Sequence, residues 1–155
     1  MKKNQKGFSL IELLIVVAII LIIAAIAIPN LLRSRMAANE ASAVGSMRTI
    51  NTAAVTYSST YPSSGYPASL GALGTSGAAT SASADLVDSV LAGGTKSGYT
   101  FKFKGDGNLP STGYSIVATP VSQGTSGQRG FFTDQSGVIR NDPAGAATSS
   151  SAPLQ

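Results

Sequence analysis

The sequence contains no histidine, no cysteine and no tryptophan, and only 12% of its residues are charged. These absences exclude a cysteine nucleophile, a histidine general base, the usual zinc ligand sets, and the attachment of haem or iron–sulfur clusters through histidine or cysteine. A serine–lysine nucleophile remains compatible with the composition. Without cysteine, disulfides cannot indicate the cellular compartment. We expect no enzyme, no cofactor and no metal site.

The chain has 155 residues, enough for about one domain with a helix and a small sheet. Its formal charge of +4 is unevenly placed, because Lys2, Lys3 and Lys6 precede a long apolar run. Removal of a leader carrying these lysines would leave eight basic residues against seven acidic ones. The basic character therefore belongs mainly to the leader, and nucleic acid is not expected as a direct ligand.

Residues 8–28 read FSLIELLIVVAIILIIAAIAI and are apolar apart from Ser9 and Glu12. At ~1.5 Å per residue, a helix over this run is roughly 31 Å long, which is sufficient to cross a membrane. The run exceeds the ~7–15 apolar residues of a secretory signal peptide, so cleavage is expected before it and not after it. The preceding lysines favour a cytoplasmic N-terminus, which places the residues after Asn30 outside.

Glu12 is the one charged residue inside the apolar run. A carboxylate near the middle of a lipid-facing helix costs about 2.5–3.5 kcal/mol on insertion scales and normally has a partner. One interpretation pairs Glu12 with an α-amino group that cleavage before Phe8 creates on a neighbouring subunit. The alternative places Glu12 near the membrane interface, where it reaches water.

Residues 6–17, KGFSLIELLIVV, resemble the type IV prepilin signature, in which a basic leader ends in Gly and is followed by Phe and by Glu at the fifth mature position. The resemblance implies that a prepilin peptidase cuts between Gly7 and Phe8. It also implies N-methylation of the Phe8 amine and a role for Glu12 in assembly. The close likeness extends over residues 6–35.

Pro29 lies at the end of the apolar run and also matches this family. It removes a backbone donor and clashes with the preceding turn, which predicts a helix kink or, alternatively, a helix end. Residues 30–61 nevertheless keep helical spacing, with an apolar stripe of Val44, Met47, Ile50, Ala54, Tyr57 and Tyr61. The outward face would carry Arg33, Asn39, Glu40 and Arg48. We predict one long helix, membrane-spanning over residues 8–29 and amphipathic over residues 30–61.

The rest of the chain predicts an α+β fold. Residues 62–98 form a connecting loop with a short helix over residues 84–91, which Gly93 ends. Alternating apolar and polar residues predict a small antiparallel sheet within residues 99–142, covered by the amphipathic helix half. Its four strands are expected at residues 99–104, 114–119, 130–133 and 138–140. The tail, residues 143–155, lacks a periodic apolar face and is expected to be flexible.

Several polar residues are better explained as turn residues or solvated charges than as metal or catalytic sites. Asp106-Gly107-Asn108 is interpreted as a hairpin turn, because calcium takes ~6–8 oxygen ligands. Residues 134–137 likewise predict a turn. Lys102 and Lys104 are interpreted as solvated strand charges. Lys96-Ser97 is not expected to act as a catalytic dyad, because nothing near it desolvates the amine.

The resemblance implies a structural subunit, the major pilin of a type IV pilus that serves adhesion, twitching motility or DNA uptake. An apolar helix that begins in lipid can leave it by burying the same surface against copies of itself, which gives a helical homopolymer. The chain has no P-loop motif. By resemblance, the partners are a prepilin peptidase, a pilus assembly ATPase, an inner-membrane platform protein and, in a cell with two membranes, a secretin. The precursor would be a single-pass inner-membrane protein, and the pilus would be extracellular.

Two other functions remain open. The chain is also compatible with a pseudopilin of a type II secretion system, although it lacks a convincing calcium site of the kind a major pseudopilin would suggest. The chain departs from several pilins as well, because it lacks their C-terminal cysteine pair. A function of another class is a signal-anchored extracytoplasmic binding module or hydrolase, which would keep its leader and stay monomeric.

Overall fold

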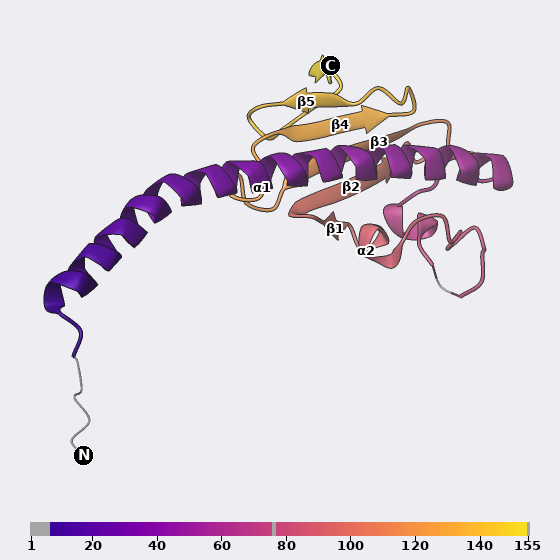
Figure 1. The fold of residues 1–155 in the computed structure, drawn as a ribbon. Coiled ribbons are helices and arrows are strands. Elements are labelled where there is room, and N and C mark those ends of the chain that lie inside the picture. Colours follow the sequence, from indigo (N-terminus) through magenta and orange to yellow (C-terminus); the bar gives the residue numbers. More distant parts are fainter. Residues whose placement is uncertain (1–6, 76, 155) are drawn as a thin grey trace. The chain divides into compact units, whose positions relative to one another are not determined.

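The computed structural model describes residues 7–75 and 77–154 (Figure 1). Residues 1–6 of the predicted leader lie outside the described residues. The chain divides into two compact units, Met1–Ser34 and Arg35–Gln155, and each is described by itself. We call the second unit the head. Helix α1 spans Leu10–Thr60, so residues 10–34 belong to the first unit and residues 35–60 to the head.

In the first unit, α1 continues through Pro29. Proline has no N–H group, so the carbonyl oxygen of Ala25 loses its helical donor. The side-chain amide of Asn30 donates a hydrogen bond to the next carbonyl oxygen, that of Ile26, at 3.1 Å. The alternative of a helix end at Pro29 is therefore wrong, while the kink stays a prediction.

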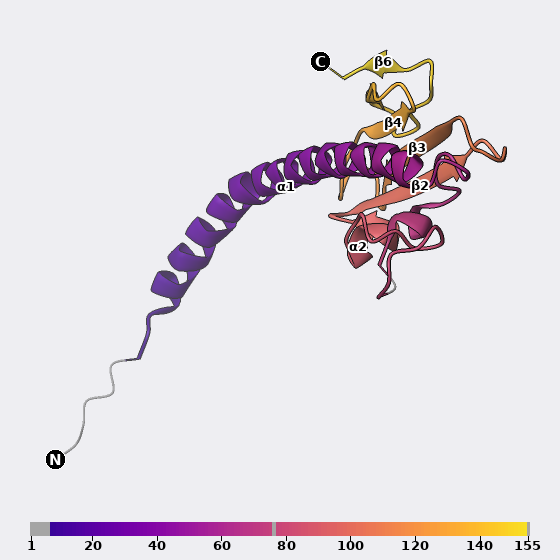
Figure 2. The ribbon, with the colours of Figure 1, turned by 90° about the vertical axis from the view of Figure 1, so that its right-hand side faces the viewer.

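The head contains an antiparallel sheet whose strands follow one another in sequence order, β1 to β6. Residues 35–60 of α1 lie across one face of this sheet, as Figures 1 and 2 show from two directions. The strands are β1 (Thr95–Lys96), β2 (Tyr99–Gly105), β3 (Tyr114–Pro120), β4 (Gly130–Asp134), β5 (Arg140–Asp142) and β6 (Ala152–Pro153). The α+β class and the packing of the helix on an antiparallel sheet are confirmed.

The core of the head lies between α1 and the sheet. Alternate strand residues point towards the helix, and the register places Phe101 beside Ala118, which in turn lies beside Phe131. All three side chains are buried. The helix contributes the predicted stripe, of which Met47, Ile50, Ala54 and Tyr57 are buried and Val44 and Tyr61 are partly buried.

Within residues 7–75 and 77–154, the sheet has six strands and not the four predicted. The additional strands, β1 and β6, are two residues long, which is too short for an alternating pattern to appear in the sequence. Ser97 and Gly98 both have positive φ, 50° and 73°, and form the tight turn that pairs β1 with β2. The composition of the tail predicts no strand, yet β6 pairs with β5, and Leu154 packs against the core.

Helical structure in the connecting segment also differs from the prediction. Helix α2 spans only Ser89–Ala92, where Asp88 accepts a hydrogen bond from the Leu91 N–H and caps the first turn. Residues 84–87, predicted as its first turns, instead bond through their N–H groups to the carbonyls of residues 72–74. That segment contains a short 3₁₀ helix, η1 (Leu70–Leu73). The last predicted strand is shifted as well, because β5 begins at Arg140 and not at Val138.

Candidate functional site

The residues predicted to direct processing lie just before α1 and are exposed. Gly7 and Phe8 precede the helix, and 83% of the Phe8 side chain is accessible. A side chain added at Gly7 would meet no atom within 4 Å, and its φ angle is not in the left-handed range. Among the described residues, the fold of this chain therefore gives no reason for glycine at position 7.

Glu12 has a local partner that the sequence analysis missed. Its carboxylate accepts a hydrogen bond from the backbone N–H of Ser9 at 2.9 Å. Ser9 precedes the first helical residue, so this contact is one half of a capping box, in which a glutamate at the third helical position satisfies the N-cap N–H. The Ser-x-x-Glu spacing in the sequence is typical of this capping contact. The negative charge itself has no cationic partner among the residues described.

The apolar side chains of residues 10–32 are exposed on every side of α1. Leu10, Leu21 and Ile26 are 79%, 63% and 65% exposed, and the most hydrophobic 18-residue window has no buried part. Water is a poor solvent for such a surface, and a continuous apolar helix of this length fits a membrane-anchored precursor. In the chain as described, this surface is uncovered and needs either lipid or another protein.

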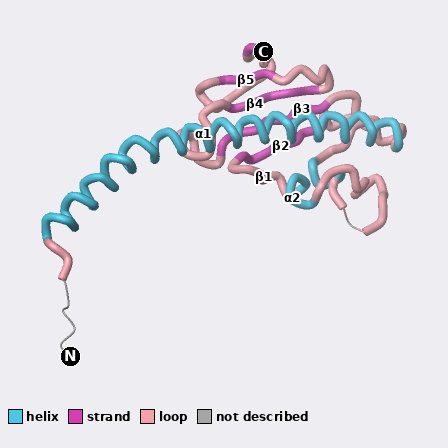
Figure 3. The backbone as a smooth tube through the Cα atoms, viewed as in Figure 1, coloured by secondary structure: helices cyan, strands magenta, loops and turns pink. Residues whose placement is uncertain are grey.

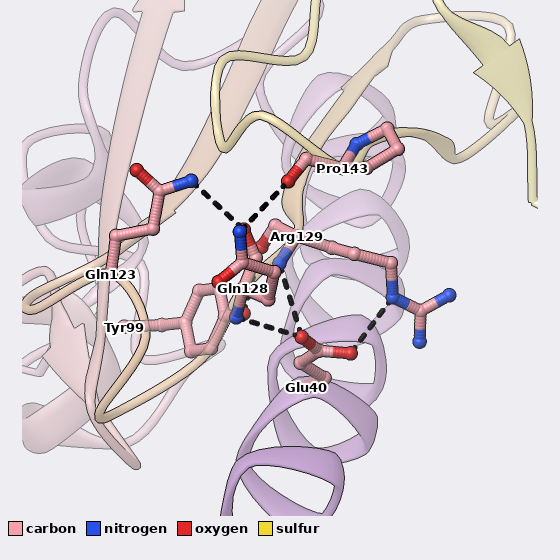
Figure 4. A network of polar contacts seen from close by, with 6 residues as sticks. All are labelled: Glu40, Tyr99, Gln123, Gln128, Arg129 and Pro143. Atoms are coloured by element: carbon pink, nitrogen blue, oxygen red, sulfur yellow. Dashed lines mark hydrogen bonds and ion pairs between the residues drawn. The ribbon is translucent and has the colours of Figure 1, made fainter. Parts of the chain in front are cut away.

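Glu40 connects α1 to the loop between β3 and β4 (Figure 4). One carboxylate oxygen accepts hydrogen bonds from the backbone N–H groups of Gln128 and Arg129, at 2.9 and 3.0 Å. The other accepts a hydrogen bond from Nε of Arg129 at 2.8 Å. Glu40 is only 7% exposed, so its predicted place on the outward face is wrong. Its neighbour Asn39 also turns towards the head and donates to the carbonyl of Ser126 at 2.8 Å.

The electrostatics of this network favour the charged form of Glu40. Burial by itself raises the pKa of Glu40, but the N–H groups of Arg129 and Gln128 and the Arg129 guanidinium outweigh it and lower the pKa below 4.5. Nearby, burial and the charge of Glu40 raise the pKa of Tyr99 to about 12. Tyr99 therefore stays a donor, and its hydroxyl bonds to the Arg129 carbonyl at 2.7 Å. Gly127 packs so tightly on this ring that an added Cβ would overlap the Tyr99 hydroxyl.

The weaker candidates take part in local structure. The amine of Lys96 pairs with the Asp88 carboxylate at 3.0 Å, and the Ser97 hydroxyl bonds to the hydroxyl of Ser42 at 2.9 Å. Lys96 and Ser97 therefore do not form a dyad. Asp106 accepts hydrogen bonds from the N–H groups of Asn108, Thr112 and Gly113, which organises the β2–β3 loop. The predicted turn at residues 134–137 is closed by a hydrogen bond from the Gly137 N–H to the Asp134 carbonyl. Lys102 and Lys104 are exposed, as predicted.

The comparisons with known proteins concern the N-terminal segment. A family model described as the prokaryotic N-terminal methylation motif matches residues 2–28. Over 38 residues the chain is 66% identical to the type IV wide pilus major component PilA4 of Thermus thermophilus. That stretch covers 24% of this chain and 29% of the relative. No solved structure matches the chain.

Proposed function

Because the chain is a type IV pilin-like protein, we propose that it is the major structural subunit of a type IV pilus. In this proposal a prepilin peptidase removes residues 1–7, the Phe8 amine is methylated, and subunits polymerise through α1 into a surface filament. An assembly ATPase and an inner-membrane platform protein would drive the process. The filament would serve adhesion, twitching motility or DNA uptake.

One observation carries the proposal: the methylation motif leads directly into an apolar helix that is exposed on every side. Such a helix can bury its apolar surface either in lipid or against identical helices. A contact between different faces of identical subunits leaves a free face at each end, so the assembly grows as a filament. A tethered enzyme or binding module requires the anchor but not the motif for leader removal and methylation.

The proposal assigns Gly7 to recognition by the peptidase. Replacement of Gly7 by leucine is expected to block cleavage and leave the full-length precursor in the membrane, with no change in the fold of the head. An immunoblot that resolves precursor from mature protein measures this. The matched control is Gly45→Ala, at a second glycine where an added side chain meets no atom within 4 Å. Normal cleavage of the Gly7→Leu precursor would contradict the assignment.

Microscopy of fibres sheared from cells distinguishes the pilus from the pseudopilus of a type II secretion system. The proposal predicts long extracellular fibres that contain this chain as their main component. The relative named above is described as the major component of a pilus, which favours this outcome. Short fibres confined to the periplasm would instead support the pseudopilin function.

A further inference from the structure

The head has a pocket near the end of α1, between residues 61–68 and the β2–β3 loop. Figure 3 shows both segments close to the last turn of the helix. The pocket has a volume of about 400 Å³, and small-molecule sites typically have ~300–1,000 Å³. No charged residue of the described ranges lines it. The side chains that matter for its chemistry are those of Tyr57, Ser64, Tyr66, Asn108, Leu109 and Ser111.

Backbone contacts fix the two segments that form the pocket. The Tyr66 N–H donates to the carbonyl oxygen of Ser111 at 3.0 Å, and the Ser111 N–H donates to the carbonyl oxygen of Ser64 at 2.9 Å. Gly65 lies so close to Ser111 that an added Cβ would overlap its carbonyl oxygen. The Asp106 carboxylate organises the β2–β3 loop from within. A pocket held in this way needs little ordering when a ligand binds.

Three polar groups at the pocket are available to a ligand. Within residues 7–75 and 77–154, the hydroxyl groups of Ser64 and Tyr66 make no hydrogen bond, although no buried polar side-chain atom of these ranges lacks a partner. The two hydroxyl groups are therefore accessible to solvent. The Asn108 side chain is exposed, and its amide nitrogen donates to Asp106 at 3.1 Å, which leaves its carbonyl oxygen free.

The apolar part of the lining comes from two tyrosine rings and a leucine. Tyr57 donates its hydroxyl hydrogen to the carbonyl of Ser81, so its ring is what it offers to the pocket. The ring of Tyr66 packs edge to face on Tyr114, with centroids 4.8 Å apart, and is only partly buried. Leu109 is 85% exposed. A tyrosine ring provides a flat apolar surface next to a polar group.

These features restrict the ligand to an uncharged molecule that has both an apolar face and polar groups. A charged ligand would lose water without meeting an opposite charge. A wholly apolar ligand would cover the free hydroxyl and amide oxygens and leave them without partners. A sugar ring meets both conditions, because its C–H groups can pack on an aromatic ring while its hydroxyl groups form hydrogen bonds.

We propose that this pocket binds a neutral saccharide. The ring of Tyr66 supplies the packing surface, and its hydroxyl group, together with Ser64 and Asn108, bonds to the hydroxyl groups of the sugar. As a means of adhesion, the inference rests on the proposed function, because a surface filament would present the pocket to another cell. Binding itself requires only a folded head, so it can be measured on subunits that have not assembled.

Saturation-transfer NMR on the full chain, in a detergent without a sugar headgroup, tests the proposal. The probes are the methyl glycosides of glucose, galactose, mannose and N-acetylglucosamine, with methyl glucuronide as the charged comparison. At least one neutral glycoside is expected to bind with millimolar affinity. Methyl glucuronide should bind about ten-fold more weakly, because its carboxylate would enter an uncharged pocket. Binding of none of the neutral glycosides, or equal binding of the glucuronide, would overturn the proposal.

Two substitutions of Tyr66 separate its ring from its hydroxyl group. Tyr66→Phe keeps the ring and should lower the affinity about three-fold, through the loss of one hydrogen bond. Tyr66→Ala removes both groups and should lower the affinity about ten-fold or more. Circular dichroism of each variant shows whether the head is folded. Wild-type affinity in folded Tyr66→Ala would contradict the assignment of this residue and overturn the site.

A third variant leaves the packing of Tyr66 on Tyr114 intact. Ala68 is exposed and lines the pocket, so Ala68→Leu fills the space without removing a contact and should abolish binding. The matched control is Ala146→Leu, at an exposed alanine outside the pocket, which should bind as the wild type does. Unchanged affinity in Ala68→Leu would place the saccharide elsewhere and overturn the proposal. Saccharide binding by a protein that forms no fibres in cells would instead refute the proposed function and leave the site in place.

Discussion

Replacement of Glu12 by alanine is expected to leave the leader cleaved but to stop filament growth. The carboxylate has no cationic partner within the described residues, and its single hydrogen bond comes from the backbone of Ser9. A lone carboxylate in the apolar part of a membrane costs about 2.5–3.5 kcal/mol, which the amine of a neighbouring Phe8 would offset in the filament. Loss of Glu12 therefore stabilises the subunit in lipid and removes a contact from the fibre. A shift of this size corresponds to about 100-fold in an assembly equilibrium.

Glu12→Gln separates the charge from the helix cap. Glutamine at the third helical position can still accept the Ser9 N–H in a capping box, but it carries no charge. Both variants are expected to yield mature protein of normal length by immunoblot and almost no fibres by microscopy. If Glu12→Gln assembled as the wild type does, capping would account for Glu12, and the pairing with a neighbouring amine would be wrong.

Replacement of Glu40 by leucine is expected to destabilise the head by about 2–4 kcal/mol, because it leaves the Arg129 guanidinium and two backbone N–H groups without their acceptor. Glu40→Gln keeps the shape and one acceptor oxygen and should lose less. Urea unfolding of the full chain in detergent, followed by circular dichroism, measures the difference. Lys102→Gln, at an exposed strand position, is the control and should unfold as the wild type does. Equal stability of Glu40→Leu and the wild type would show that the network contributes nothing.

The same network predicts how stability depends on pH. The pKa of Glu40 is lower in the folded head than its ordinary value of 4.5, so unfolding is accompanied by proton uptake in acid. The contribution of Glu40 is therefore fully present above about pH 4.5 and is lost as the pH falls through the folded pKa. Between pH 5 and pH 3, the wild type should lose more stability than Glu40→Gln. Parallel curves for the two proteins would contradict the lowered pKa.

The sequence predicts the parts of this fold that repeat a pattern over many residues. The apolar stripe from Val44 to Tyr61 and the alternation in β2 are both long enough to reveal which face is buried. Strand β1 depends on the turn at Ser97, and strand β6 depends on pairing with β5. Neither of these two-residue strands shows a periodic pattern in the sequence. Helix α2 is shorter than predicted because residues 84–87 bond to a segment distant in sequence.

The burial of Glu40 was harder to predict than that of the apolar stripe. It precedes Met47 by seven residues and therefore lies on the same side of the helix as the buried stripe. A pattern of apolar residues does not identify Glu40 as buried, because glutamate side chains are ordinarily exposed. Its burial depends on the Gln128 and Arg129 N–H groups, which belong to a loop about 88 residues later in the chain. At the N-terminus, by contrast, Gly7, Phe8 and Glu12 form a local motif that sequence alone identifies.

The proposed function depends on one event, in which the chain would lose its charged leader and exchange lipid for identical helices. The most direct test is the intact mass of the subunit recovered from sheared fibres. We expect a single species that begins at Phe8 and carries one added methyl group. A protein that retains Met1 and stays monomeric in the membrane would contradict the account.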